Sequence, residues 1–292
     1  MTESTPAAAA GIAKPDGRRR WLIIALLFVA TTVNYVDRTM LGLLAPSLGK
    51  EMGWSENDYG TIVTAFQAAY AMGFLIMGWL IDRFGPKIGY AIAITVWTVG
   101  HVAHGFASTV GGFMAARVVL GVGEAGHFPA VARSSSEWFP QKERALAIGW
   151  VNSGTNIGVI VTAPVLALFM NHLGLGWRET FIWSGLFGVA LLLLWWKLYS
   201  NPRESGKVSE AELAWIEHDP PEKVEQVAWR RLMGVVYRQG VGAASRHLGV
   251  AGYRQKVVLH QVAVVCSDLA AELQQNLLLK QPRMPKLVLT IS

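Results

Sequence analysis

Residues 78–87, GWLIDRFGPK, form a short charged connection between two long apolar stretches at 59–80 and 88–108. A helix needs about 20 mostly apolar residues to cross the ~30 Å hydrocarbon core of a bilayer. Both stretches reach that length. They predict two membrane-spanning helices joined by a loop at the membrane surface.

Four further segments have the same character. They lie at about 21–46, 110–132, 144–170 and 179–199. The whole chain is 52% hydrophobic and only 16% charged, against about 25% charged residues in soluble domains. Single-span anchors or a buried soluble core would not produce six such segments in succession. We therefore expect an all-α membrane protein with a bundle of six helices.

The distribution of positive charge predicts the orientation of this bundle. Lys and Arg gather before the first segment, between the second and third, between the fourth and fifth, and after the sixth. The opposite loops hold only Lys50 and Arg178. Because cytoplasmic loops carry the excess of Lys and Arg, the N-terminus is expected in the cytoplasm.

Four regions follow from this reading. They are a cytoplasmic N-terminus at 1–20, the bundle at 21–199, a cytoplasmic connector at 200–227 and an atypical basic tail at 228–292. A helix start is expected at Ser209. The tail holds nine Lys and Arg against two Asp and Glu. Its apolar stretches are too short to cross a bilayer, so we expect no seventh span and at most a short helix near 262–279.

Few ionisable residues lie inside the predicted spans, and each is a functional candidate because its burial in a bilayer is costly. They are Asp37, Arg38, Arg117 and Glu124. At ~1.5 Å rise per residue, all four fall in one band near the midplane. Arg117 and Glu124 are two helical turns apart and share a face, whereas Asp37 and Arg38 point ~100° apart.

Two acids and two arginines at one depth suit the transport of an anion together with protons. The planar guanidinium groups can hold a carboxylate through two hydrogen bonds, and the desolvated acids can carry protons. The alternative is that the four residues pair off as static ion pairs that hold the bundle together. Both interpretations can hold in different transport states.

Residues 78–87 resemble the signature loop GxLxDRxGxK of the major facilitator superfamily. The segment RVVLGVG at 117–123 is similar to the RxxxGxG motif of its fourth span. The resemblance implies twelve spans in two six-helix halves, each half built from two inverted three-helix repeats, with substrate held between the halves. It also implies a cytoplasmic gating loop formed by Gly78, Asp82, Arg83, Gly85 and Lys87.

Three finer motifs resemble the anion:cation symporter family within that superfamily. They are NYVDR at 34–38, EAGHFP at 124–129 and EWFPQKERA at 137–145. The resemblance implies that Arg38, Tyr70 and Arg117 hold the substrate, with Tyr35 as a further polar group. It implies that Asp37 and Glu124 carry the coupling protons. In the fifth span, where the family commonly has Gln, Asn152 and Asn156 are the nearest candidates.

We therefore expect proton-coupled symport of a small organic anion across the inner membrane, and no enzymatic activity. A hexuronate such as glucuronate or galacturonate is the first choice of substrate, and an aldonate such as galactonate is the second. No cofactor or metal is expected. Residues 121–126 spell GxGxxG, but that dinucleotide motif needs a preceding strand, which a mid-span position does not offer.

The resemblance covers about residues 15–232, which is one half of the superfamily fold. A frameshift or an early end of the coding sequence is the simplest explanation for the unfamiliar tail. The alternative is a six-span half-transporter or membrane partner that does not transport by itself. The buried acids and arginines favour a symporter by ancestry, because a purely structural protein gains nothing from their desolvation cost.

Overall fold

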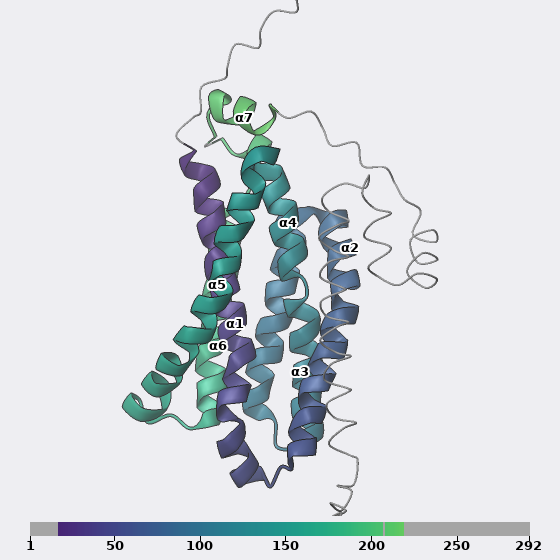
Figure 1. The fold of residues 1–292 in the computed structure, drawn as a ribbon, viewed down its shortest axis with the longest axis vertical. Helices are drawn as coiled ribbons and strands as arrows, with labels where there is room; N and C mark the ends of the chain where they lie inside the picture. Colours follow the sequence, from purple (N-terminus) through teal and green to yellow (C-terminus); the bar gives the residue numbers. More distant parts are fainter. Residues whose placement is uncertain (1–16, 207, 219–292) are drawn as a thin grey trace, which may run out of the picture.

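The computed structural model describes residues 17–206 and 208–218, and this part of the chain is helical throughout (Figure 1). The predicted tail at 228–292, its lack of a seventh span and the short helix expected near 262–279 lie outside the described residues. The helices are α1 Arg18–Met52, α2 Glu56–Ala103, η1 His104–Phe106, α3 Val110–Glu124, α4 His127–Trp138, α5 Gln141–Ala167, η2 Leu168–His172, α6 Trp177–Leu198, η3 Pro202–Glu204 and α7 Glu210–Ile216.

The long helix α2 is two antiparallel crossings joined by a tight turn. At ~1.5 Å per residue, its 48 residues are far longer than one bilayer requires. Gly85 interrupts it with φ 77° and ψ 166°, a backbone conformation that residues with a side chain rarely adopt. Met77 and Ala93, eight residues before and after this glycine, both lie against Gly126 of the fourth crossing. The turn therefore reverses the chain.

The fourth crossing is divided between α3 and α4, which follow one another along the bundle (Figure 1). The sequence predicted one continuous helix at 110–132. The structure instead breaks it at Ala125 and Gly126 and continues it to Trp138. Pro129 explains the break, because it has no N–H for the carbonyl of Ala125 and its ring crowds that carbonyl. The break comes directly after Glu124.

With α2 counted as two crossings and α3–α4 as one, the helices cross the bundle six times, as predicted. Four helical segments in the described part are individually long and apolar enough to span a membrane: Arg18–Met52, Glu56–Phe106, Gln141–His172 and Trp177–Leu198. The outer surface is apolar, with Met72, Ile160 and Leu193 each at least 65% exposed. Such a surface suits a hydrocarbon environment.

Glycines allow the fourth crossing to pack closely against both halves of α2. A Cβ atom on Gly121 would lie 2.8 Å from the carbonyl oxygen of Phe66, and one on Gly123 would overlap the backbone of Trp97. Small residues permit this approach of helix backbones in lipid. The packing fixes the position of α3, which carries Arg117 and Glu124.

Two hydrophobic clusters occupy the two ends of the bundle. The first contains the large buried side chains Trp97, Trp138 and Trp195. The second contains Met40, Phe113 and Phe181. Buried polar side chains of α1, α2, α3 and α6, namely Asp37, His101, Arg117 and Ser184, belong to neither cluster.

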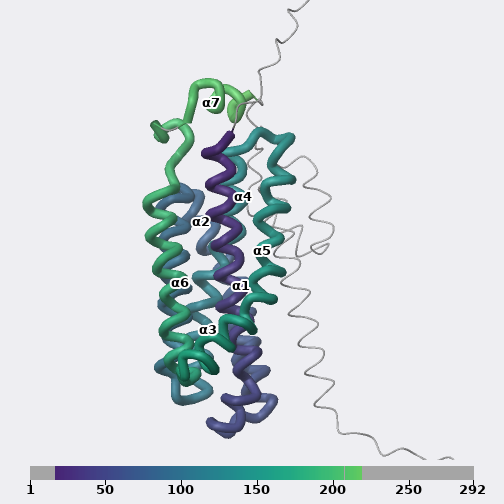
Figure 2. Tube along the Cα trace, turned by 90° about the vertical axis from the view of Figure 1, so that its left-hand side faces the viewer, coloured from purple at the N-terminus to yellow at the C-terminus, as the bar shows by residue number. Residues whose placement is uncertain are grey.

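Helix α7 lies at the end of the bundle where α1 begins (Figures 1 and 2). It starts as predicted at Ser209, whose hydroxyl accepts a hydrogen bond from the N–H of Glu212. At the other end, α2 begins with a capping box in which the N–H and hydroxyl of Ser55 donate to the carboxylate of Asp58. These hydrogen bonds lower the pKa of Asp58.

The fold predicts that Lys50 and Lys142 are reached from opposite sides of the membrane. Lys50 is exposed near the end of α1, and Lys142 is exposed near the start of α5, at opposite ends of the bundle. In a Cys266→Ser background, Lys50→Cys and Lys142→Cys should react with an impermeant maleimide from different sides. Labelling of both cysteines from the same side would contradict this topology.

Candidate functional site

A polar layer lies between the two hydrophobic clusters at mid-height in the bundle. On α1, Asp37 follows the first cluster and adjoins the second. His101 of α2, Arg117 of α3 and Ser184 of α6 occupy the corresponding positions on their helices. Each of these four side chains is at most 5% exposed. Polar groups buried this deeply need partners within the protein.

The central contact is an ion pair between Arg38 of α1 and Glu124 of α3. Nε and Nη2 of Arg38 donate to the same oxygen, Oε2 of Glu124, at 3.0 and 2.8 Å. The Glu124 side chain is fully buried, whereas that of Arg38 is 27% exposed. The pair is therefore accessible from the side of the arginine only.

Aromatic rings surround the Arg38 guanidinium. Its Cζ lies 5.0 Å from the ring centre of Tyr35, 5.0 Å from that of Phe66 and 4.8 Å from that of Tyr70. Cation–π contacts of this kind stabilise a positive charge away from water. Tyr35 and Tyr70, which the sequence identified, and Phe66, which it did not, thus form the walls around the arginine.

Arg117 is close to this pair without belonging to it. Its Nη2 donates to the backbone carbonyl of Arg38 at 3.4 Å, and its Cζ lies 5.4 Å from the ring centre of Phe66. Its buried Nε has no hydrogen-bond partner in the described part of the chain. The shared helix face predicted for Arg117 and Glu124 does not produce a hydrogen-bonded pair, because Glu124 turns to Arg38 instead. Arg117 retains a donor for another anion.

Asp37 and Arg38 point to different helices, as their adjacency predicted. Oδ1 of Asp37 lies 3.4 Å from Nδ1 of His101 on α2, and Nε2 of His101 lies 2.7 Å from Oγ of Ser184 on α6. His101 was not among the site residues predicted from the sequence. No spacing rule connects it with Asp37, because the two residues come from different helices.

His127 is a fully partnered link between helices. Its Nε2 lies 2.8 Å from Oγ1 of Thr31, which itself donates to the carbonyl of Leu27. The hydroxyl of Tyr90 lies 2.6 Å from its Nδ1. Both ring nitrogens therefore have fixed partners, and the geometry favours a packing role for His127.

Asn152 and Asn156 do not join the polar layer. Both are exposed on α5 and make no side-chain hydrogen bond in the part of the chain that the structure describes. Between them and beyond, Gly154 and Gly158 pack against Thr31 and Tyr35 of α1. The two amides therefore lie on helix surface beside this contact.

In the part of the chain that the structure describes, the charged side chains of the loop after the second crossing form one weak ion pair. Oδ1 of Asp82 lies 3.9 Å from Nη1 of Arg133 on α4, and Asp82 is 67% exposed. Arg83 is also exposed, and a Cβ atom on Gly78 would meet nothing within 4 Å. The carbonyl of Lys87 accepts a hydrogen bond from Nε1 of Trp195 at 3.0 Å.

Stronger contacts at this end come from residues that were not chosen as site residues. Nη1 of Arg20 lies 2.9 Å from Oε2 of Glu143, and this pair is largely buried. Nε of Arg133 donates to Glu137 at 2.6 Å, and the hydroxyl of Tyr199 donates to the same carboxylate at 3.2 Å. The motif at 137–145 therefore supplies two carboxylates that join elements: Glu143 links α5 to α1, and Glu137 links α4 to Tyr199 at the end of α6.

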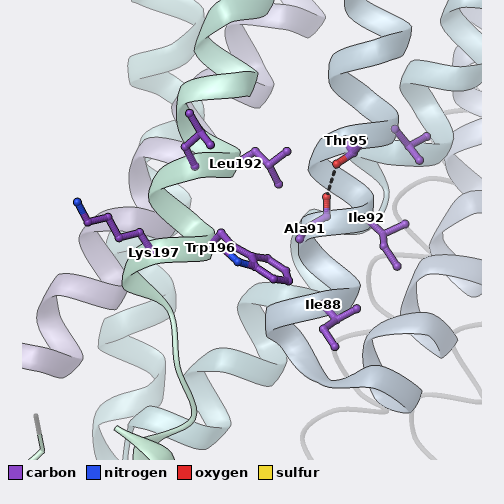
Figure 3. Close-up of a pocket in the computed structure, with 9 residues that line it drawn as sticks. Ile88, Ala91, Ile92, Thr95, Leu192, Trp196 and Lys197 are labelled. Carbon is purple, nitrogen blue, oxygen red and sulfur yellow. Dashed lines mark hydrogen bonds between the residues drawn. The ribbon is translucent and has the colours of Figure 1, made fainter. Parts of the chain in front are cut away.

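An apolar groove of about 800 Å³ lies between the second half of α2 and α6 (Figure 3). Ile88, Ile92, Leu192 and Trp196 line it, together with the exposed Lys197. It has no buried charge that could hold a small anion. The polar layer, by contrast, contains the buried charged residues Asp37 and Arg117, with Glu124 close by.

The chain belongs to the Major Facilitator Superfamily, whose pattern it matches over residues 27–264. The match enters the region after residue 232, where the motif resemblance ended. Three curated relatives are each 35% identical: a D-galactonate transporter and a hexuronate transporter of Escherichia coli, and a probable galactarate/D-glucarate transporter of Bacillus subtilis. The alignments cover 70%, 68% and 70% of this chain and 47%, 45% and 46% of the relatives. The chain thus spans about half the length of these relatives.

Solved structures have the same fold. A bacterial homologue of the human lysosomal transporter Spinster, in an inward-facing conformation, aligns with a TM-score of 0.60 at 18% identity over 92% of this chain and 65% of that chain. The xylose transporter of E. coli aligns with a TM-score of 0.54 at 15% identity over 89% and 71%. The described helices are therefore the N-terminal six-helix half of the superfamily fold, in two inverted three-helix repeats. This family consists of transporters, not enzymes.

The two kinds of ion pair predict different effects on stability. Glu143→Gln removes the partner of Arg20, which is only 1% exposed, and should cost about 3–5 kcal/mol as for other buried pairs. Asp82→Asn, the matched control in the exposed pair, should cost about 0–1 kcal/mol. Unfolding in detergent measures both variants. Equal losses would contradict the burial argument.

Proposed function

We propose that this chain supplies the substrate-binding and proton-carrying residues of a symporter for sugar acids. The observation that carries the proposal is the Arg38–Glu124 ion pair, buried on the Glu124 side and open on the Arg38 side. The relatives named above transport D-galactonate and hexuronates, or are named as probable transporters of galactarate and D-glucarate. These molecules are all polyhydroxylated carboxylic acids, and a hexuronate is our first choice of substrate.

The substrate carboxylate binds between Arg38 and Arg117. Both guanidinium groups border Phe66, with Cζ at 5.0 and 5.4 Å from its ring centre. The unpartnered Nε of Arg117 and the exposed side of Arg38 provide the donors. Tyr35 and Tyr70 contribute hydroxyl groups beside the sugar.

Glu124 couples a proton to this binding by competing for Arg38. In the structure, two N–H groups of Arg38 are directed to Glu124. A substrate carboxylate can take these donors only if Glu124 gives them up. Protonation neutralises Glu124 and weakens its hold on the arginine, because charge-assisted hydrogen bonds are about twice as strong as neutral ones. The arriving anion then replaces one negative charge with another.

Asp37 carries a second coupling proton. It is 2% exposed and faces His101, so among the described residues it has no cationic side chain as a hydrogen-bonded partner unless that histidine is protonated. A desolvated carboxyl group without such a partner favours its neutral form. Asp37 is thus able to bind and release a proton in the plane of the substrate.

The gating residues act at the end of the bundle where the chain begins. Gly78, Asp82, Arg83, Gly85 and Lys87 belong to the loop that separates the two halves of α2. The weak Asp82–Arg133 contact at 3.9 Å can form and break as the helices rock. We place this loop, residues 1–20 and residues 200–227 on the cytoplasmic side of the inner membrane, in accordance with the excess of positive charge there.

Glu124→Gln should abolish accumulation of D-glucuronate driven by a pH gradient while leaving substrate exchange intact. Exchange requires binding and conformational change, but no net movement of protons. Proteoliposomes containing the transporter that carries these spans would show both activities. Glu56→Gln, at the exposed start of α2, is the control. Unchanged accumulation by Glu124→Gln would refute the coupling role.

Arg117→Lys should weaken D-glucuronate binding at least about tenfold, which corresponds to about 1.4 kcal/mol. A lysine offers a point charge in place of the planar guanidinium fork. Isothermal titration measures the loss, and Arg203→Lys at a 75% exposed position is the control. Full affinity in Arg117→Lys would mean that Arg117 serves structure through the Arg38 carbonyl.

A further inference from the structure

Three crossings meet at a buried chain of polar groups beside the ion pair. Asp37 of α1, His101 of α2 and Ser184 of α6 are 2%, 0% and 0% exposed. The imidazole lies between the other two side chains, with Nδ1 at 3.4 Å from Oδ1 of Asp37 and Nε2 at 2.7 Å from Oγ of Ser184. The positions of the protons in this chain can be derived from the contacts.

The hydroxyl group of Ser184 donates its proton to a backbone carbonyl of its own helix, α6. Oγ of Ser184 lies 2.7 Å from the carbonyl oxygen of Thr180 and donates to it. If the hydroxyl donated to His101 instead, two acceptor oxygens would face each other at 2.7 Å without a proton between them. Ser184 therefore accepts from His101, and the proton of a neutral imidazole lies on Nε2.

This tautomer leaves a lone pair on Nδ1 that faces Asp37. Nδ1 of His101 and Oδ1 of Asp37 are both buried, and neither makes a hydrogen bond in the described part of the chain, their mutual contact being 3.4 Å long. His127 shows the contrast, because its Nδ1 receives the hydroxyl proton of Tyr90 at 2.6 Å. A hydrogen bond between Nδ1 of His101 and Oδ1 of Asp37 requires a proton that one of these two side chains carries itself.

We propose that Asp37 and His101 hold one proton between them, and that His101, oriented by Ser184, is the positioning residue for the proton-carrying Asp37. This inference rests on the coupling role proposed above for Asp37. The proton lies on Oδ1, where it is donated to Nδ1, or on Nδ1, where it is donated to the carboxylate. Both forms have the same total charge, and no other group changes its proton.

The surrounding charges favour this single proton. Arg117 acts electrostatically on both Asp37 and His101, and opposes a second proton that would make the pair cationic. Glu124 acts on Asp37 and opposes an anionic pair. Arg38 neighbours Asp37 but points to Glu124. His104 stacks on Phe181 and directs Nδ1 to the Gly100 carbonyl.

Loss of the proton changes the contact between helices. When the proton leaves for water on one side of the membrane, the carboxylate and the Nδ1 lone pair oppose each other in a buried site. The 3.4 Å contact, already longer than the usual 2.7–3.2 Å of a hydrogen bond, then becomes repulsive. Proton release at Asp37 thereby loosens α1 from the second half of α2.

Histidine nitrogen NMR on the full chain in lipid nanodiscs tests this inference. The chain has seven histidines, and His101→Gln assigns the signals of His101. In the wild type, we expect Nε2 protonated and Nδ1 hydrogen-bonded to a proton retained throughout the range of about pH 5–8, in which an ordinary histidine titrates. Asp37→Leu should abolish the Nδ1 hydrogen-bond signal, and Ser184→Ala should shift part of the population to the Nδ1–H tautomer.

The signals of His127 are the internal control, since its partners Thr31 and Tyr90 remain in all these variants. A wild-type spectrum with a free Nδ1, with Nδ1–H as the neutral tautomer, or with ordinary titration over this range would overturn the inference without any variant. The measurement needs neither substrate nor transport. Failure of D-glucuronate to bind would therefore refute the proposed function while leaving the shared proton in place.

Discussion

The structure of the bundle depends on the burial of the Glu124 carboxylate within a membrane helix. An ionised group in this position is costly unless it is paired and hydrogen-bonded. Arg38 supplies both requirements through two N–H groups on one oxygen, and three aromatic rings surround the arginine. The first and fourth crossings must stay in register for this pair to form, so the ion pair that we propose as the coupling element also constrains helix packing.

The close packing of the fourth crossing against α2 helps to fix the position of Glu124 relative to the first crossing. Gly121 and Gly123 bring α3 against the backbone of α2, and Pro129 interrupts the helix directly beyond Glu124. Because a backbone contact leaves little room for side-chain adjustment, we expect the fourth crossing to move as a rigid body. At the end of the bundle where α1 begins, the Asp82–Arg133 contact is long and exposed and the Arg20–Glu143 pair is buried, so under the proposed function the first is expected to open and the second to hold.

Much of this arrangement could be predicted from the sequence. Apolar length gave the six crossings, and depth along the helices placed the two acids and two arginines in one layer. Partners on different helices could not be predicted, because helical spacing only relates residues of one helix. Helical spacing therefore placed Arg117 on the same helix face as Glu124, whereas in the structure Arg38 of another helix forms the ion pair with Glu124. Helical spacing also could not predict the contact between His101 and Asp37. Nor could it show that Asn152 and Asn156 are exposed beside the contact of α5 with α1.

The central claim is that the substrate carboxylate and the Glu124 carboxylate compete for the N–H groups of Arg38, so that binding of the anion requires a proton on Glu124. The most direct measurement is calorimetric titration of the transporter with D-glucuronate in buffers that differ in ionisation enthalpy, which counts protons taken up on binding. The account predicts uptake of about one proton per bound anion near neutral pH, lost in Glu124→Gln. Tight binding with no proton uptake in the wild type would contradict it.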